Sequence, residues 1–204
     1  MTEHPDVAWK DDFEKCVKFH GHACPGLALG YRAGKAAMAW LGERRAPDEE
    51  IVAIVETDAC GSDAIQVLTG CTFGKGNFIH KDYGKHAFSL LSRASGKGVR
   101  LSKKSGGFAL SERHRALFDK MRTKEATKEE LNEFWDLHGK KCREVLEAPI
   151  EDLFSLEEVS MTLPPRANMT DSRPCDACGE PVMSTKLVEH KGKSLCRACI
   201  EKEG

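Results

Sequence analysis

The sequence lacks an excess of charge of either sign. Its 31 lysines and arginines almost balance its 32 aspartates and glutamates, which leaves a formal net charge of −1. A strongly basic balance would indicate nucleic-acid binding, and an acidic tail would be equally visible in the totals. Neither signature is present, so any charged partner has to be sought in local features.

Long apolar runs are also missing. No stretch approaches the roughly 18 to 20 apolar residues that a membrane-spanning helix needs. The N-terminal segment MTEHPDVAWKDDFEKC carries acidic residues where a signal peptide would have an apolar run. We therefore expect a cytoplasmic protein with no membrane partner. A length of 204 residues suits one hydrophobic core and a small appendage.

Cysteine, by contrast, is abundant, with nine residues in the chain. In a reducing compartment such usage indicates metal binding or catalysis more often than disulfides. Two Cys-x-x-Cys pairs lie near the C-terminus, with seventeen residues between them. This spacing is typical of a tetrahedral zinc site, and a closed shell of four thiolates leaves no position for chemistry. We expect structural zinc on Cys175, Cys178, Cys196 and Cys199.

The sequence around these cysteines predicts a small zinc-finger domain over 174–204, of the treble-clef or zinc-ribbon kind. The segment between the pairs alternates around a Lys-Gly turn, which indicates a hairpin, and the last pair can begin a short helix. Metal binding would supply most of its folding energy. Nucleic acid stays open as a partner, although the finger's charges nearly cancel and it has no aromatic side chain for base stacking.

The preceding residues predict an α+β core domain over 1–163, joined to the finger by a polar, proline-bearing linker over 164–173. Apolar periodicity, capping residues and β-branched runs define its elements. Helices are expected over 11–21, 25–41, 63–69, 111–122 and 127–148, and strands over 51–58, 76–80, 86–92 and 98–104. A short helix or turn and a last strand are expected within 150–163.

The segment FHGHACPG, residues 19–26, forms the junction between the first two expected helices. It places two histidines and a cysteine close together, and these side chains are ligands for zinc and other late first-row metals. Cys60 follows an expected strand and precedes a helix, a common place for ligand-binding groups. The sequence therefore predicts a second metal site, zinc by preference, on His20, His22, Cys24 and Cys60.

Two alternatives remain open for this second group. A thiolate at a helix N-terminus has a lowered pKa, so Cys24 or Cys60 could instead be a nucleophile or redox thiol. The junction could also be structural, with both cysteines as small core residues. Cys16 and Cys142 are expected to be plain core residues. Four histidines without ligand spacing are expected to serve as surface or packing residues: His80, His86, His114 and His138.

The stretch CGSDAIQVLTGCTFGKGN, residues 60–77, carries further polar candidates. Ser62 or Asp63 can cap the helix, and a Gly-rich turn follows it. Asp63 and Lys75 join Cys24 and Cys60 as candidate catalytic residues. The candidate substrate-binding residues are Cys71, Lys75 and Asn77. A helix of this length would hold Cys60 and Cys71 at opposite ends.

FHGHACPGLALGYRAG followed by CGSDAIQVLTGCTFGKGN resembles the E-subunit family of formylmethanofuran dehydrogenase, over roughly residues 10 to 150. The resemblance implies a dimeric α+β core with a metal-capable cleft. Matching positions are His20, His22, Cys24, Cys60, Asp63, Cys71, Lys75 and Asn77. It also implies association with a molybdenum or tungsten formylmethanofuran dehydrogenase of one-carbon metabolism.

Three functions follow from these features. The first is a metal-binding accessory protein or enzyme that uses the His/Cys cleft. The second is a regulatory protein whose finger contacts a protein or nucleic acid. The third is a redox protein with a cysteine pair such as Cys60 and Cys71, which is disfavoured because disulfides need Cα atoms within about 7 Å. We favour the first.

Overall fold

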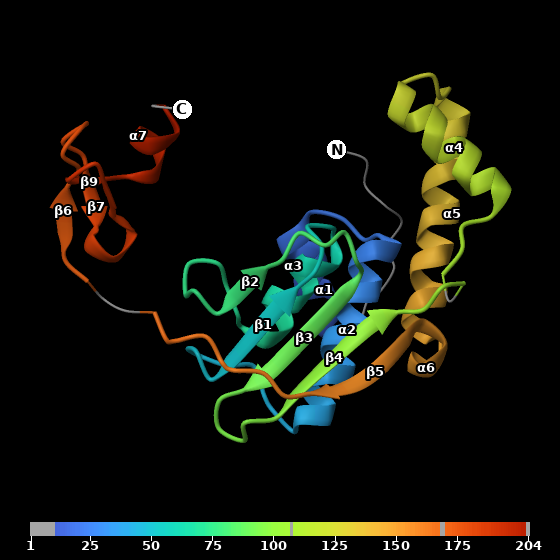
Figure 1. Cartoon of the computed structure of the whole chain (residues 1–204). Coiled ribbons are helices and arrows are strands. Elements are labelled where there is room, and N and C mark those ends of the chain that lie inside the picture. Colours follow the sequence, from blue (N-terminus) through green and yellow to red (C-terminus); the bar gives the residue numbers. More distant parts are fainter. Residues whose placement is uncertain (1–10, 107, 168–169, 203–204) are drawn as a thin grey trace. The chain divides into compact units, whose positions relative to one another are not determined.

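The chain forms two compact units, residues 1–166 and 167–204 (Figure 1). The computed structural model describes residues 11–106, 108–167 and 170–202. Residues 1–10 and 107 of the expected core domain, residues 168–169 of the expected linker and the last two finger residues therefore lie outside the described part. In that part, no helix combines the length and the apolar character needed to cross a membrane.

One mixed sheet forms the centre of the first unit. Its strands are β1 (Ile51–Val55), β2 (Phe78–His80), β3 (Ala87–Ser92), β4 (Gly98–Lys103) and β5 (Phe154–Val159), in the order β2-β1-β3-β4-β5. The β1–β2 pair is parallel, and the other three pairs are antiparallel. Every residue of β1 and β3 is buried, as expected for central strands whose sequences are rich in apolar residues.

Three helices lie on one side of this sheet (Figure 1). They are α2 (Pro25–Leu41) and α3 (Gly61–Thr69), which contact its strands, and α1 (Asp11–His20), which packs against these two helices. The buried face of α2 packs with Phe88 and Leu90 of β3 and Val99 and Leu101 of β4 in one hydrophobic core. Pro25 opens α2 at its first turn and Gly42, with a φ of 68°, closes it, as the sequence predicts.

Two longer helices follow the sheet: α4 (Glu112–Thr123) and α5 (Lys128–Glu147), which lie side by side as a helical hairpin (Figure 1). The capping box expected at Thr127 and Glu130 is confirmed, since each side chain accepts a hydrogen bond from the other residue's backbone N–H. The C-terminal part of α5 brings Cys142 and Val145 into the core. A single turn, α6 (Ile150–Leu153), then leads into β5.

The start of α3 differs from the expectation. The helix begins at Gly61, and neither Ser62 nor Asp63 caps it. Both residues already lie within the first turn: the Ser62 hydroxyl donates to the carbonyl oxygen of Thr57, and Asp63 contacts His20. Capping is a property of the residue before the first turn, and that residue is Cys60.

The second unit has the hairpins and the helix that its sequence indicates. Its elements are β6 (Ser172–Pro174), β7 (Pro181–Met183), the 3-10 turn η1 (Ser184–Lys186), β8 (Val188–His190), β9 (Lys193–Leu195) and α7 (Arg197–Glu201). Strand β6 pairs with β7 and lies mostly within the stretch expected as linker. The Lys191–Gly192 turn joins β8 and β9, with both residues at positive φ, as a two-residue hairpin turn requires.

Glycines allow α2 and α3 to pack in backbone contact. A Cβ atom added to Gly30 would lie 2.1 Å from the carbonyl oxygen of Gly61, and one added to Gly61 would lie 3.2 Å from the Cα of Gly30. One turn earlier, a Cβ on Gly26 would lie 3.3 Å from the Cβ of Cys60. This contact therefore determines how close Cys60 comes to the start of α2.

Replacement of Gly30 should separate these helices. We expect Gly30→Ala to lower the free energy of unfolding by about 3 kcal/mol or more, because its methyl group meets backbone atoms that cannot move aside. Gly139→Ala is the matched control, since nothing lies within 4 Å of that Cβ position in α5. The control should be neutral or stabilising by up to about 1 kcal/mol. Urea unfolding measures both, and equal stabilities of the two variants would contradict the packing role.

Candidate functional site

The ends of three helices bring three potential metal ligands together. His20 is the last residue of α1, and Cys24 caps the start of α2. Cys60 directly precedes α3, and its side chain makes no capping hydrogen bond there. One donor atom of each side chain lies within 4.8 Å of the other two. The structure thus joins three of the four residues predicted for the second metal site, from segments far apart in the sequence.

The junction between α1 and α2 has local causes in the sequence. Gly21 adopts a φ of 97° and donates its N–H to the carbonyl oxygen of Val17, which ends α1. Cys24 is extended, and its sulfur accepts a hydrogen bond of 3.3 Å from the backbone N–H of Leu27. The sulfur of Cys24 therefore acts as the N-cap of α2, where the helix dipole favours a thiolate.

Asp63 orients His20 from the other side of its ring. The Nδ1 atom of His20 lies 2.7 Å from Oδ2 of Asp63, and its Nε2 atom lies 3.9 Å from the sulfur of Cys24. A carboxylate on one ring nitrogen leaves the other available as a ligand, which is the usual arrangement behind metal-bound histidines. The same geometry resembles the orienting acid and base of a thiol nucleophile.

The two site cysteines have opposite acidities because they share a proton. A hydrogen bond from Cys24, together with the nearby His20, lowers the pKa of Cys60 to about 6 despite its partial burial. The pKa of Cys24 is strongly raised, first by its hydrogen bond with Cys60 and then by burial. The pair thus holds one negative charge readily, on the half-buried sulfur of Cys60.

His22 is not part of this group of donors. Its ring lies beside that of His20, with 4.6 Å between centroids, and it meets Trp135 of α5 edge-on at 6.3 Å. Metal ligation by His22 remains a prediction. Trp135 and Cys142 border the site without having been proposed for it; the Cys142 sulfur donates to the carbonyl oxygen of Cys24 over 3.6 Å. Because α5 is distant in sequence, no local pattern could have indicated them.

Three other predicted residues lie elsewhere, near the amino end of β1, whereas Cys60 follows its carboxyl end. The sulfur of Cys71 donates to the carbonyl oxygen of Ile51, the first residue of the strand. Asn77 donates to the same oxygen, and Lys75 donates to the carbonyl oxygens of Pro47 and Asp48. The structure therefore does not bring Lys75 or Cys71 to Cys60. Cys60 and Cys71 lie on either side of α3 and are both free, in line with the expectation that disfavoured a disulfide between them. The roles of Cys71, Lys75 and Asn77 in substrate binding stay predictions.

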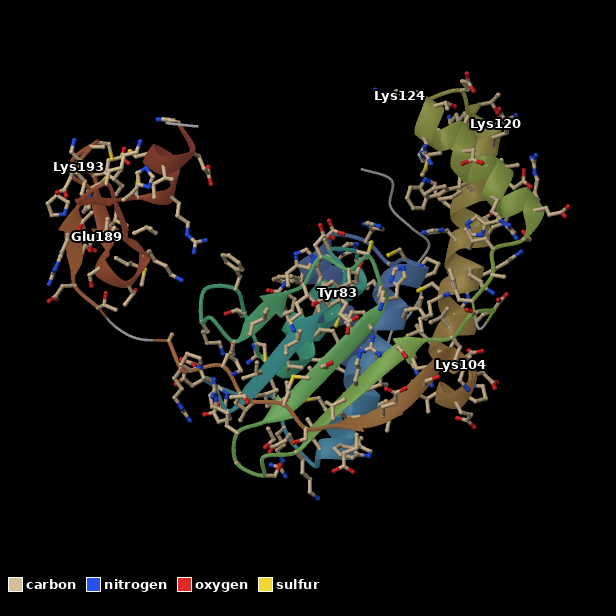
Figure 2. All side chains as sticks on the ribbon, in the orientation of Figure 1. Tyr83, Lys104, Lys120, Lys124, Glu189 and Lys193 are labelled. Atoms are coloured by element: carbon tan, nitrogen blue, oxygen red, sulfur yellow. The ribbon has the colours of Figure 1, made fainter. Side chains whose placement is uncertain are left out.

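The second unit gathers its four cysteines as the sequence predicts. One sulfur from each of Cys175, Cys178, Cys196 and Cys199 lies within 4.8 Å of the others, so the group can hold a metal ion. Backbone N–H groups of Cys178, Cys196 and Ala177 lower the pKa of Cys175 to about 6. Around this group the charges are mixed, with Glu189 on β8 and Lys193 on β9 (Figure 2).

Comparison with known proteins identifies the family. The model described as "FmdE, Molybdenum formylmethanofuran dehydrogenase operon" matches residues 19–155, more than half of the chain. The chain belongs to this FmdE family. The match includes His20, Cys24, Cys60 and Asp63, so the candidate site lies within the family region.

Two relatives extend the comparison. A protein of Archaeoglobus fulgidus named "Probable S-adenosyl-L-methionine-binding protein" is 36% identical over 195 residues, which are 91% of this chain and 51% of the relative. The chain thus spans about half the length of that curated relative. The crystal structure of a tungsten formylmethanofuran dehydrogenase FmdE-like protein from Syntrophus aciditrophicus is similar with a TM-score of 0.60 and 25% identity, over 93% of this chain and 90% of that one.

The acidity of Cys60 gives a direct test of the site's electrostatics. In the metal-free protein, alkylation of Cys60 by iodoacetamide should be half-maximal near pH 6, whereas an ordinary thiol has a pKa of about 8.5. Because the lowered pKa preserves the thiolate, the rate should hold as pH falls from 8 to 7 and drop through pH 6. Cys142, whose pKa burial raises to about 12, should stay unmodified. Half-maximal alkylation of Cys60 at pH 8 or above would contradict the shared-proton geometry.

Proposed function

We propose that the core domain of this FmdE-family protein is a metal centre with His20, Cys24 and Cys60 as its ligands. The observation that carries the proposal is the convergence of one nitrogen and two sulfur donors within 4.8 Å at three helix ends. This mixed donor set suits zinc or another late first-row metal. Three protein ligands leave one tetrahedral position for water or a substrate.

The residues around these donors fit this role. Asp63 holds the ring of His20 so that Nε2 is directed toward the sulfurs, the amino end of α2 stabilises negative charge on Cys24, and Cys60 ionises near neutral pH. A bound zinc ion would supply Lewis-acid polarisation at its open position. Cys24 is buried and Cys60 half-buried, so the metal would be shielded on its protein side.

The finger is proposed to carry a second ion, zinc, with a structural role. Four sulfurs complete a tetrahedral shell, and the few buried side chains of this unit include Cys175 and Leu195. So small a core makes the ion the main source of folding energy. The two sites therefore differ in kind, with a closed shell in the finger and an open one in the core.

The family description and the name of the Syntrophus aciditrophicus protein support a place beside molybdenum or tungsten formylmethanofuran dehydrogenase. We propose that the chain is an accessory protein or enzyme of that system, acting through the core metal centre. The name of the Archaeoglobus fulgidus relative adds S-adenosyl-L-methionine as a ligand to assay. The second candidate function is a regulatory protein whose finger contacts a protein or nucleic acid. It is supported by the compact unit that residues 167–204 form on their own.

Metal analysis of the full chain tests the two sites separately. We expect two metal ions per wild-type chain and one in His20→Ala or Cys60→Ser. Cys178→Ser should also bind one, because it breaks the finger shell only. Cys16→Ser is the control: Cys16 is buried in α1 and its sulfur donates to a carbonyl oxygen of its own helix. The Cys16→Ser variant should keep both ions. The proposed core centre would be contradicted if the wild-type chain bound only one ion and only Cys178→Ser lost it.

Asp63 should tune this centre without being a ligand. Asp63→Asn keeps the size of the side chain but weakens the hold on His20 Nδ1. We expect the affinity for the core metal to fall about 10- to 100-fold while the saturating stoichiometry is unchanged. Competition with a zinc chelator measures the affinity. Loss of the ion at saturation would instead make Asp63 a ligand, and an unchanged affinity would remove its orienting role.

A further inference from the structure

The two sulfurs of the core site face each other as well as a potential metal position. The Cys24 and Cys60 sulfurs lie within 4.8 Å of one another. Both side chains lie over the same point of α2, since a Cβ on Gly26 would lie 3.3 Å from the Cβ of Cys60, 3.7 Å from its sulfur and 3.9 Å from the sulfur of Cys24. Both cysteines are unbridged in the structure.

A disulfide requires sulfurs that can approach to about 2.0 Å and Cβ atoms about 3.5–4.5 Å apart. The sulfurs of Cys24 and Cys60 already lie within 4.8 Å of each other, so rotation of two short side chains about χ1 is the movement that would close the remaining gap. Among the described core cysteines, the others have different surroundings. The Cys142 sulfur is directed at the backbone oxygen of Cys24, Cys71 at Ile51 and Cys16 at its own helix.

Exposure distinguishes the two partners. The Cys24 side chain is buried, with 3% of the residue exposed, whereas Cys60 is only partly buried. An oxidant from solvent therefore reaches Cys60 first, and the buried Cys24 is placed to react with whatever forms there. Redox-sensitive cysteines commonly show this combination of an accessible sulfur and a neighbouring resolving thiol.

We infer that Cys24 and Cys60 form a reversible disulfide when the protein meets a peroxide, which makes this pair an oxidation site. The Cys60 thiol is oxidised by hydrogen peroxide to a sulfenic acid, with release of one water. The Cys24 thiol then attacks that sulfur, forms the S–S bond and releases the second water. Two thiols lose two electrons and the peroxide gains them, so that each peroxide oxygen leaves as water.

This modification concerns the same sulfurs as the proposed metal centre, but it does not rest on a metal being bound there. If both proposals hold, the disulfide removes two of three ligands, and oxidation releases the core ion. If the core binds no metal, the disulfide still forms. The two proposals can therefore fail independently.

Peptide mapping of the full chain tests the inference. The protein is treated with one to a few equivalents of hydrogen peroxide, with and without prior chelation, alkylated and digested with trypsin. Cys24 falls in the peptide 19–32, and Cys60 shares the peptide 46–75 with Cys71. We expect these peptides to become joined, with loss of two hydrogen atoms and two free thiols, and to separate again with dithiothreitol. Finger disulfides appear in other peptides.

Variants then locate the bond and decide the outcome. Cys71→Ser and Cys142→Ser should keep the joined peptides, whereas Cys24→Ser and Cys60→Ser should lose them. In Cys24→Ser, Cys60 should accumulate as a sulfenic acid that a dimedone probe captures. The inference is overturned if Cys60 of the wild-type protein proceeds to sulfinic acid with no cross-link. It is also overturned if Cys60 or Cys24 forms its disulfide with Cys71 or Cys142 instead. Circular dichroism checks that each variant is folded.

Discussion

The close packing of α2 against α3 is the contact on which the candidate site depends. Glycine at position 30 lets the two backbones approach to a distance that a Cβ there would prevent, and a Cβ at Gly61 would be tightly packed. Helices normally pack with 8–10 Å between their axes, and small residues at the crossing allow the shorter end of that range. Here the crossing lies next to the two helix starts, so it brings their cap residues together. Both cap residues are cysteines.

This position gives the sulfurs an unusual electrostatic environment. The amino ends of helices favour negative charge, yet burial raises the pKa of a thiol. The protein divides these effects between the two residues, so that Cys60 ionises and Cys24 keeps the shared proton. His20, held by Asp63, adds a nitrogen donor at the same place. The proposed metal centre and the proposed disulfide both depend on this one arrangement.

The finger differs from the core site, because its four sulfurs come from two short segments of one small unit. Cys175 and Cys178 lie in the connection between β6 and β7, whereas Cys196 directly follows β9 and Cys199 lies in α7. Backbone N–H groups point at the sulfur of Cys175. Local geometry is enough to form such a site once an ion is present. The core site instead requires the folded domain, since its donors belong to α1, α2 and α3. Loss of packing in the core domain would therefore remove the core site and leave the four-cysteine site of the finger.

Much of the architecture could be predicted from the sequence because its signals are local. Gly21 and Gly42 end helices, Thr127 and Glu130 begin one, β-branched runs mark β1, and the cysteine spacing defines the finger. Chain proximity alone placed His20, His22 and Cys24 together as candidates.

Only the tertiary structure decided which of the candidates meet. It joined Cys60 and Asp63 to His20 and Cys24, left His22 beside the aromatic ring of Trp135, and placed Lys75 and Cys71 at the far end of β1. Cys71 and Lys75 follow Cys60 in the same stretch of sequence, but helix α3 separates them from it. The sequence by itself determined the elements and the donor types, since these follow from short-range backbone preferences and spacing. The contacts between elements depend on how helices and strands pack, which no local pattern encodes.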